Sequence, residues 1–227
     1  MLSSGAMGEG ISDWSRFERL TPFRVRDVLL VASHFDHYLL EESGYLAEIM
    51  QEEYSDLNLS QAPRIIHSPD ARDALRLLRA REFDLVITMT RVGEMDVKAF
   101  GTEAKRVIEG LPVVMLSHNT RELATLSAGD GIDRIFVWTG DSRILLSICK
   151  LLEDERNVEN DVRDGDVQVI LLIEDSRRFY SAYLPLLYTQ LVNQTTRLMG
   201  EGGNLHEKLL RLRARAKILL ASDMNTA

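Results

Sequence analysis

The chain has 227 residues, of which 45% are hydrophobic and 27% are charged, an ordinary composition for a globular protein with a buried core. Its formal net charge of -8 repels nucleic acid and anionic membrane surfaces, so neither is expected as a partner. The one cysteine, Cys149, excludes an internal disulfide, and no apolar run reaches the roughly 20 residues of a membrane span. Residues 1–23 lack the apolar segment of a signal peptide, and we expect an N-terminal leader on a cytoplasmic protein.

Short apolar runs alternate with longer segments of helical period from Val25 onward, a pattern typical of βα units around a parallel sheet. Residues 68–70, Ser-Pro-Asp, support the start of one helix, because they combine a capping residue with an early proline. Five such units predict a doubly wound α/β domain over 24–155. The predicted strands are 27–33, 63–67, 84–89, 112–117 and 133–138, and the predicted helices are 36–57, 70–81, 96–109, 119–127 and 141–155.

The stretch ERNVENDVRDGD, residues 155–166, is polar and has no apolar period of a strand or core helix, and it predicts a linker over 156–166. The segment 167–227 follows, with a predicted strand at 168–173, a helix at 176–199 and a last apolar run in KILLASDMNTA. A strand-helix-strand unit of this size has too little core to fold alone. We therefore expect it to pack on another surface, with self-association as a homodimer favoured.

The segment 167–227 also repeats the start of the domain before it. The run LLVAS, residues 29–33, aligns with LLIED, residues 171–175, at an offset of 142, and RII, residues 64–66, aligns with KIL, residues 217–219, at an offset of 153. In this register the last residue falls where the second helix of the first domain begins. We therefore expect a partial second copy that lacks three strands.

Three segments carry a resemblance to a known family. FDLVITMTRVGEMD (83–96), LPVVMLSHNTRE (111–122) and GIDRIFVWTGDSRILL (131–146) resemble the third, fourth and fifth strands of the receiver domain of bacterial response regulators, with the loops that follow. The resemblance covers 24–155 and implies a flavodoxin-like fold whose site lies at the C-terminal edge of the sheet. In receivers an aspartate accepts phosphoryl, an acid pair holds Mg²⁺, a hydroxyl binds a phosphoryl oxygen and a lysine balances the charge.

The resemblance places other residues at most of these positions. Met89 falls at the acceptor position, Ala32 and Ser33 fall at the acid pair, and Trp138 falls at the lysine, while Ser117 keeps the hydroxyl. A thioether cannot form an acyl phosphate. The resemblance therefore implies a pseudo-receiver with a degenerate site and no catalytic residue, which acts as a noncatalytic signalling module through protein partners.

The second copy keeps an acid pair, Glu174 and Asp175, at the metal-binding positions. With no third carboxylate, these two residues offer at most a weak Mg²⁺ site, and we expect no other cofactor. The favoured interpretation of the pair is that Glu174, Asp175 and Ser176 start a helix, where carboxylates cap free amides and favour the positive end of the dipole.

A narrower resemblance suggests a second function. The stretches RVRDVLLVASHFDHYLLEE and QVILLIEDSRRFYSAYLPLLYTQL resemble the tandem receiver-like N-terminal region of proteins related to phosphoenolpyruvate synthase and pyruvate phosphate dikinase. This resemblance implies a regulatory fragment of a phosphotransferase. The chain itself is not expected to be an enzyme, because catalytic domains of that family would lie outside it.

Three other groups invite functional readings. His34, Asp36 and His37 stand within four positions, but such spacing rarely converges on one metal ion without a further ligand, and a solvated or capping cluster is favoured. Cys149 lies on an apolar helical stripe, which favours a buried thiol over a nucleophile. The basic run RLRARAK, residues 211–217, is expected to be a solvated helix face.

Overall fold

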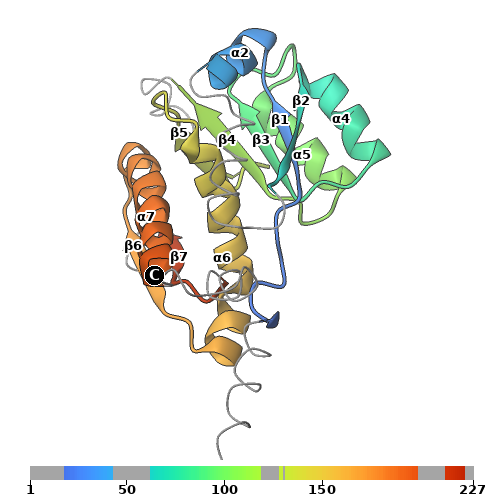
Figure 1. Cartoon of the computed structure of the whole chain (residues 1–227). Helices are drawn as coiled ribbons and strands as arrows, with labels where there is room; N and C mark the ends of the chain where they lie inside the picture. The colour runs from blue at the N-terminus through green and yellow to red at the C-terminus, as the bar shows by residue number, and fades with distance from the viewer. Residues whose placement is uncertain (1–17, 43–61, 119–127, 130, 199–212, 223–227) are drawn as a thin grey trace, which may run out of the picture.

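The computed structural model describes residues 18–42, 62–118, 128–129, 131–198 and 213–222. Five parallel strands form one sheet in the order β2-β1-β3-β4-β5, which is the strand order of the flavodoxin-like doubly wound fold. The predicted fold class is therefore confirmed. The strands are β1 (Asp27–Val31), β2 (Arg64–Ser68), β3 (Leu85–Met89), β4 (Val113–Ser117) and β5 (Arg134–Val137) (Figure 1).

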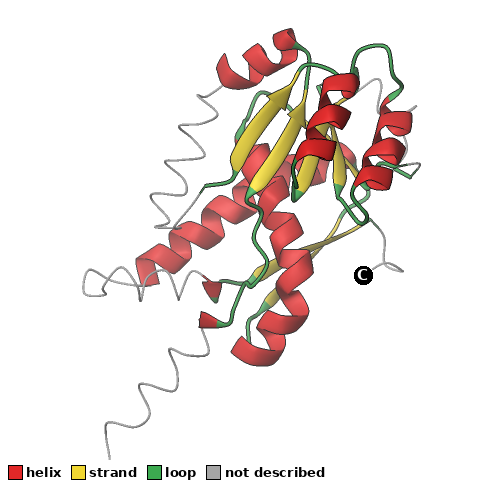
Figure 2. Ribbon diagram, turned by 90° about the vertical axis from the view of Figure 1, so that its right-hand side faces the viewer, coloured by secondary structure: helices red, strands yellow, loops and turns green. Residues whose placement is uncertain are grey.

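Helices cover both faces of this sheet (Figure 2). Side chains on β1 alternate: Val28 and Leu30 enter the core on one face, while Leu29 and Val31 enter the core on the other, as expected of a strand buried on both sides. The first face carries α2 (His34–Glu42) and α6 (Arg143–Gly165), and the second carries α4 (Ala71–Ala80) and α5 (Val97–Val107).

Of the helices predicted in the first domain, 70–81 and 96–109 agree with α4 and α5, whereas 141–155 ends ten residues before α6 does. Of the helix predicted over 36–57, the described residues extend only to Glu42, and they form the end of α2. The helix predicted over 119–127 lies outside the described residues. Asp70 caps α4, since its carboxylate accepts from the amide of Asp73 at 2.9 Å. Asp96 caps α5 in the same way.

The predicted linker over 156–166 is wrong as secondary structure. Helix α6 continues from Arg143 to Gly165 and ends at Asp166, whose backbone is left-handed with φ 51°. The helix persists because three polar residues on one side of it are buried rather than solvated: Asp154, Asn157 and Asp161 are each 0% exposed. Buried polar partners therefore take the place of the apolar stripe whose absence suggested a linker.

The second unit consists of β6 (Val169–Ile173), α7 (Arg177–Leu198) and β7 (Lys217–Ala221), with β6 and β7 parallel. Val169 pairs with Lys217 as Asp27 pairs with Arg64, so the predicted offsets of 142 and 153 hold in three dimensions. The backbone hydrogen bonds repeat as well. The amide of Arg64 donates to the carbonyl of Arg26 at 2.7 Å, and the amide of Lys217 donates to the carbonyl of Gln168 at 2.9 Å.

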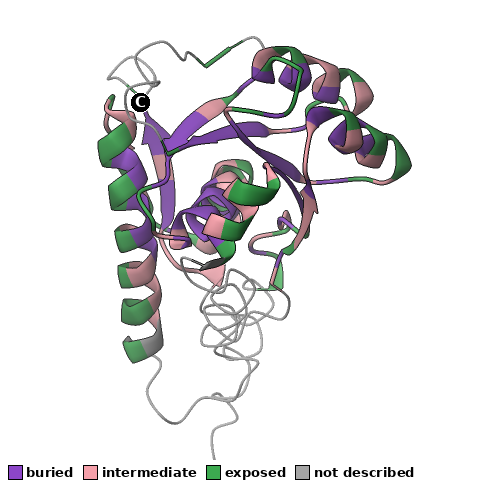
Figure 3. Ribbon diagram, turned by 90° about the horizontal axis from the view of Figure 1, so that it is seen from above, coloured by how far each residue is buried: buried purple, intermediate pink, exposed green. Residues whose placement is uncertain are grey.

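This second unit packs against the first within the same chain. Ile218 and Leu220 of β7 and Leu184 and Tyr188 of α7 belong to the same buried cluster as the inner residues of α6. In Figure 3 the inner side of α7 is buried and its outer side is exposed. The expectation that this unit needs another surface is thus met in part by α6, and self-association stays a prediction.

Among the described helices, none is both long and apolar enough to cross a membrane.

Candidate functional site

In a doubly wound sheet, ligands bind beyond the carboxyl ends of the strands, beside the point where the strand order reverses. Here that point lies between β1 and β3, where Ala32 and Met89 stand. Both are buried, with 0% and 1% of their surface exposed, and they lie in one apolar cluster with Leu116 and Trp138. Three of the predicted site residues, Ala32, Met89 and Trp138, thus belong to the same apolar cluster.

Ser117 and Trp138 face each other at the ends of β4 and β5. The amide of Trp138 donates to the carbonyl of Ser117 at 2.8 Å, and Ser117 is 0% exposed. The indole Nε1 of Trp138 is the one buried side-chain polar atom of the described residues that has no hydrogen-bond partner. An indole offers a hydrogen-bond donor but no charge, so it cannot replace an ammonium group in balancing a phosphoryl group.

Ser33, at the other acid-pair position, caps α2. Its hydroxyl donates to the carboxylate of Asp36 at 2.7 Å and accepts from the amide of Asp36 at 3.1 Å. Asp36 therefore belongs to a capping arrangement, as the sequence predicted.

The two histidines of that helix meet a third one from β2. His37 stacks on His67 with ring centroids 3.9 Å apart, His34 meets His67 edge-on, and His67 Nε2 lies 2.7 Å from the carbonyl oxygen of Ala32. Burial, followed by the neighbouring His67, lowers the pKa of His37. Within the described part of the chain, no three His, Cys, Asp or Glu side chains are grouped so that they could hold a metal ion.

Glu174 and Asp175 lie between β6 and α7. The carboxylate of Glu174 accepts from the amide of Ser176 at 2.9 Å, and the carbonyl of Ser176 accepts from the first turn of α7. This geometry is that of a helix start. The described residues bring no third carboxylate to the pair, so the donor set does not fit a strong Mg²⁺ site.

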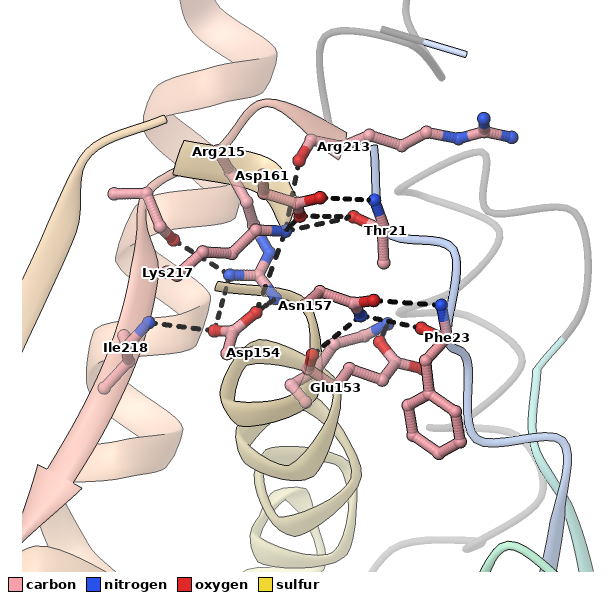
Figure 4. A network of polar contacts seen from close by, with 12 residues as sticks. Thr21, Phe23, Glu153, Asp154, Asn157, Asp161, Arg213, Arg215, Lys217 and Ile218 are labelled. Atoms are coloured by element: carbon pink, nitrogen blue, oxygen red, sulfur yellow. Dashed lines mark hydrogen bonds and ion pairs between the residues drawn. The ribbon is translucent and has the colours of Figure 1, made fainter. Parts of the chain in front are cut away.

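A buried polar network joins α6 to β7, and Asp154 is at its centre (Figure 4). Its carboxylate accepts two bonds from the guanidinium of Arg215 at 2.8 and 2.9 Å, one from the amide of Ile218 at 2.9 Å and one from the hydroxyl of Tyr188 at 3.0 Å. Burial by itself would lower the pKa of the Arg215 guanidinium. The carboxylate of Asp154 has the larger effect together with its hydrogen bonds, so the pKa is raised. Arg215 is therefore charged, and its charge is matched by a bidentate partner.

The same network binds the segment before β1. Asp161 accepts from the amide of Thr21 at 2.8 Å and pairs with Lys217 Nζ at 2.7 Å, and Lys217 Nζ also donates to the Thr21 hydroxyl at 3.0 Å. One helix turn earlier, the side-chain Nδ2 of Asn157 donates to the backbone carbonyl of Phe23 at 2.8 Å, and its side-chain Oδ1 accepts from the backbone amide of Phe23 at 2.9 Å. The segment before β1 and the start of β7, far apart in sequence, thus meet on one face of α6.

Sequence reasoning missed this network. The basic run 211–217 was expected to be solvated, and that expectation is wrong for Arg215 and Lys217, whose side chains are 8% and 2% exposed. The signal that could have revealed it is the helical spacing of Asp154, Asn157 and Asp161. Cys149, in contrast, is buried as predicted, and burial raises the pKa of its thiol to about 12.

No family model matches the sequence, and no curated protein matches it. Among solved structures, the chain is similar to a CheY-like receiver domain from Methanospirillum hungatei at 18% identity and a TM-score of 0.46, which covers 60% of this chain and 98% of that one. It is also similar to the receiver domain of an HD domain-containing protein from Pseudomonas fluorescens, at 21% identity and a TM-score of 0.41, over 61% of this chain and 94% of that one. A chemotaxis response regulator from Vibrio cholerae matches at 17% identity and a TM-score of 0.42, over 55% and 95%.

Proposed function

We propose that this chain is a receiver-type regulatory module that works without phosphorylation and acts through protein contacts. The observation that carries the proposal is Met89, which stands at the C-terminal end of the central strand β3 with 1% of its surface exposed. A thioether there can neither accept a phosphoryl group nor bind a hard cation such as Mg²⁺. Ala32 and Trp138 pack in the same cluster, so the position holds apolar side chains where receivers carry charged ones.

The way in which the second unit is attached supports a role in protein contacts. In this proposal α6 serves as the connecting element, since its first half lies in the core of the five-stranded sheet and its second half carries the network that holds β7. Arg134 of β5 adds a further link, because its guanidinium pairs with Glu155 at 2.5 Å and donates to the carbonyl of Leu220 at 3.3 Å. A change at one unit can then reach the other through packed and paired groups.

The proposal is tested by incubating the purified full chain with acetyl phosphate and Mg²⁺ and mapping acid-labile phosphate by mass spectrometry. We expect none on residues 24–155, while a receiver domain with an acceptor aspartate, treated in parallel, takes up phosphate. Phosphate mapped to an aspartate at the C-terminal edge of the sheet would overturn the proposal.

A further inference from the structure

Strands β1 and β6 have the same place in the repeat but very different surroundings. Leu29 and Val31 of β1 are 0% exposed, because α4 and α5 cover that face of the sheet. Their counterparts at the offset of 142, Leu171 and Ile173 of β6, are 45% and 38% exposed. The opposite face of β6 is covered, since Ile170 and Leu172 pack against the common core. One apolar face of β6 is therefore bare among the described residues.

The backbone of β6 also has a free edge in the described part of the chain, where β7 is its only strand partner. The carbonyl of Gln168 and the amide of Glu174 bond to β7. Since alternate residues of a strand present their backbone groups to opposite sides, those of Val169, Leu171 and Ile173 point away from β7. In the first unit the corresponding side of β1 pairs with β3, beginning at the carbonyl of Asp27, which accepts from Asp84 at 2.9 Å.

The contrast with β5 shows that another sheet edge of this chain is protected. The amide of Val137 donates to the hydroxyl of Ser181 at 2.9 Å, and the hydroxyl of Tyr180 donates to the carbonyl of Ile135, so α7 satisfies the outer edge of β5. Strand β6, VILLI, has none of the charges or prolines with which proteins usually protect an open edge. An apolar, unprotected edge next to a bare apolar face is typical of a surface that a partner covers.

We propose that the open edge and bare face of β6 form a docking site for a strand-helix segment supplied from outside these 227 residues. Its apolar strand adds parallel to β6, as β3 adds to β1, and its helix covers Leu171 and Ile173. A second copy of the chain fits less well. Two β6 edges paired across a two-fold axis would run antiparallel and satisfy the edge, but the face with Leu171 and Ile173 would stay bare. The proposal deepens the proposed function, because it names the contact surface.

The probe is a fluorescent synthetic peptide with residues 82–108 of this chain, which contains β3 and α5 and so imitates the segment that covers β1. Fluorescence anisotropy measures its binding to the full chain, and hydrogen exchange follows the amide of Leu171. We expect saturable binding that slows this exchange. Leu171→Lys places a charge on the bare face and should weaken binding at least about tenfold. The matched control is Val162→Lys on α6, where an aliphatic side chain of similar exposure, 43%, is replaced outside β6 and binding should not change.

Absence of saturable binding to the wild type, or equal weakening in both variants, would overturn the proposal. So would slow exchange of the Leu171 amide before peptide is added: with a dimer in sedimentation it would mean that a second copy covers the edge, and with a monomer that the chain covers its own edge. These outcomes are separate from those of the phosphorylation test. Phosphate on residues 24–155 would refute the proposed function and leave the β6 site standing, and failure of peptide binding would leave the phosphorylation result unchanged.

Discussion

Replacing Asp154 by alanine tests whether the buried network holds the second unit on α6. Asp154 is 0% exposed, and its carboxylate is the common acceptor for Arg215, Ile218 and Tyr188. The side chain of Arg215 is only 8% exposed, so the substitution leaves its guanidinium buried without the carboxylate that pairs with it. It also leaves the amide of Ile218 without an acceptor at the start of β7.

The magnitude follows from the unpaired charge. Removing one partner of a buried ion pair typically costs about 3–5 kcal/mol, because the remaining charge stays desolvated. A single domain has a total stability of about 5–15 kcal/mol. We therefore expect Asp154→Ala to release β7 and α7 before the five-stranded sheet unfolds, so that a single urea transition becomes two.

Urea unfolding followed by circular dichroism, together with hydrogen exchange at the amide of Ile218, measures this effect. Glu103→Ala is the control, since Glu103 forms a surface ion pair with Arg106 on α5 and its loss should cost no more than about 1 kcal/mol. The double variant Asp154→Ala with Arg215→Met removes both charges and should regain part of the lost stability.

The double variant shows whether the unpaired charge of Arg215 causes the loss of stability. If it is as unstable as Asp154→Ala alone, the cost comes from the lost packing and the orphaned amide of Ile218 rather than from the unpaired guanidinium of Arg215. If Asp154→Ala unfolds in one transition at the wild-type urea concentration, the network does not hold the second unit.

Three other predictions follow from single contacts. Ser33→Ala removes the cap of α2 and should lower the free energy of unfolding by about 1 kcal/mol, whereas Ser33→Thr should keep most of it in urea titrations; equal stability of all three proteins would contradict the capping role. Burial, opposed by Arg177 and Arg134, raises the pKa of Tyr180 from its usual 10.0 to about 12, so its contribution is present below pH 10 and is lost as the pH rises to about 12. Between pH 10 and about 12 the free energy of unfolding of the wild type should fall by about 2–3 kcal/mol more than that of Tyr180→Phe. Parallel curves of unfolding free energy against pH would argue against this shift of the pKa. Calorimetry should show millimolar Mg²⁺ binding or none, since Glu174 and Asp175 lack a third carboxylate; micromolar binding that disappears in Glu174→Ala with Asp175→Ala would reveal a missed ligand.

The sequence predicted the five-stranded sheet because most of its strands, above all β3 and β4, are buried on both faces and so stand out as short apolar runs. The strand predicted at 84–89, for example, is observed as Leu85–Met89. The repeat was also readable, since VLLV (28–31) and ILLI (170–173) are alike and pair with their partner strands in the same register, although the partner lies 37 positions on in the first unit and 48 in the second. These features are local in sequence, and local patterns of hydrophobicity are sufficient to reveal them.

The extent of α6 and the polar network could not be predicted in the same way. The residues that bury Asp154 and Glu153 are distant in sequence: Arg215 is 61 positions from Asp154, and Val25 is 128 positions from Glu153. A polar stripe on a helix looks solvated until its partners are known. The exposure of β6 could not be predicted for a similar reason, because an apolar strand is buried or exposed according to which elements pack beside it.

The network also bears on how the two units are oriented. A buried ion pair adds little net stability compared with apolar residues of the same volume, because desolvation offsets much of the attraction. Its effect on geometry is larger. Arg215 and Lys217 find their carboxylates, Asp154 and Asp161, on α6 only when β7 lies at the observed position, and any shift of β7 would leave these charges buried and unpaired. The network therefore penalises other arrangements of the second unit more than it stabilises this one, and in the described part of the chain it leaves β6 with one open edge.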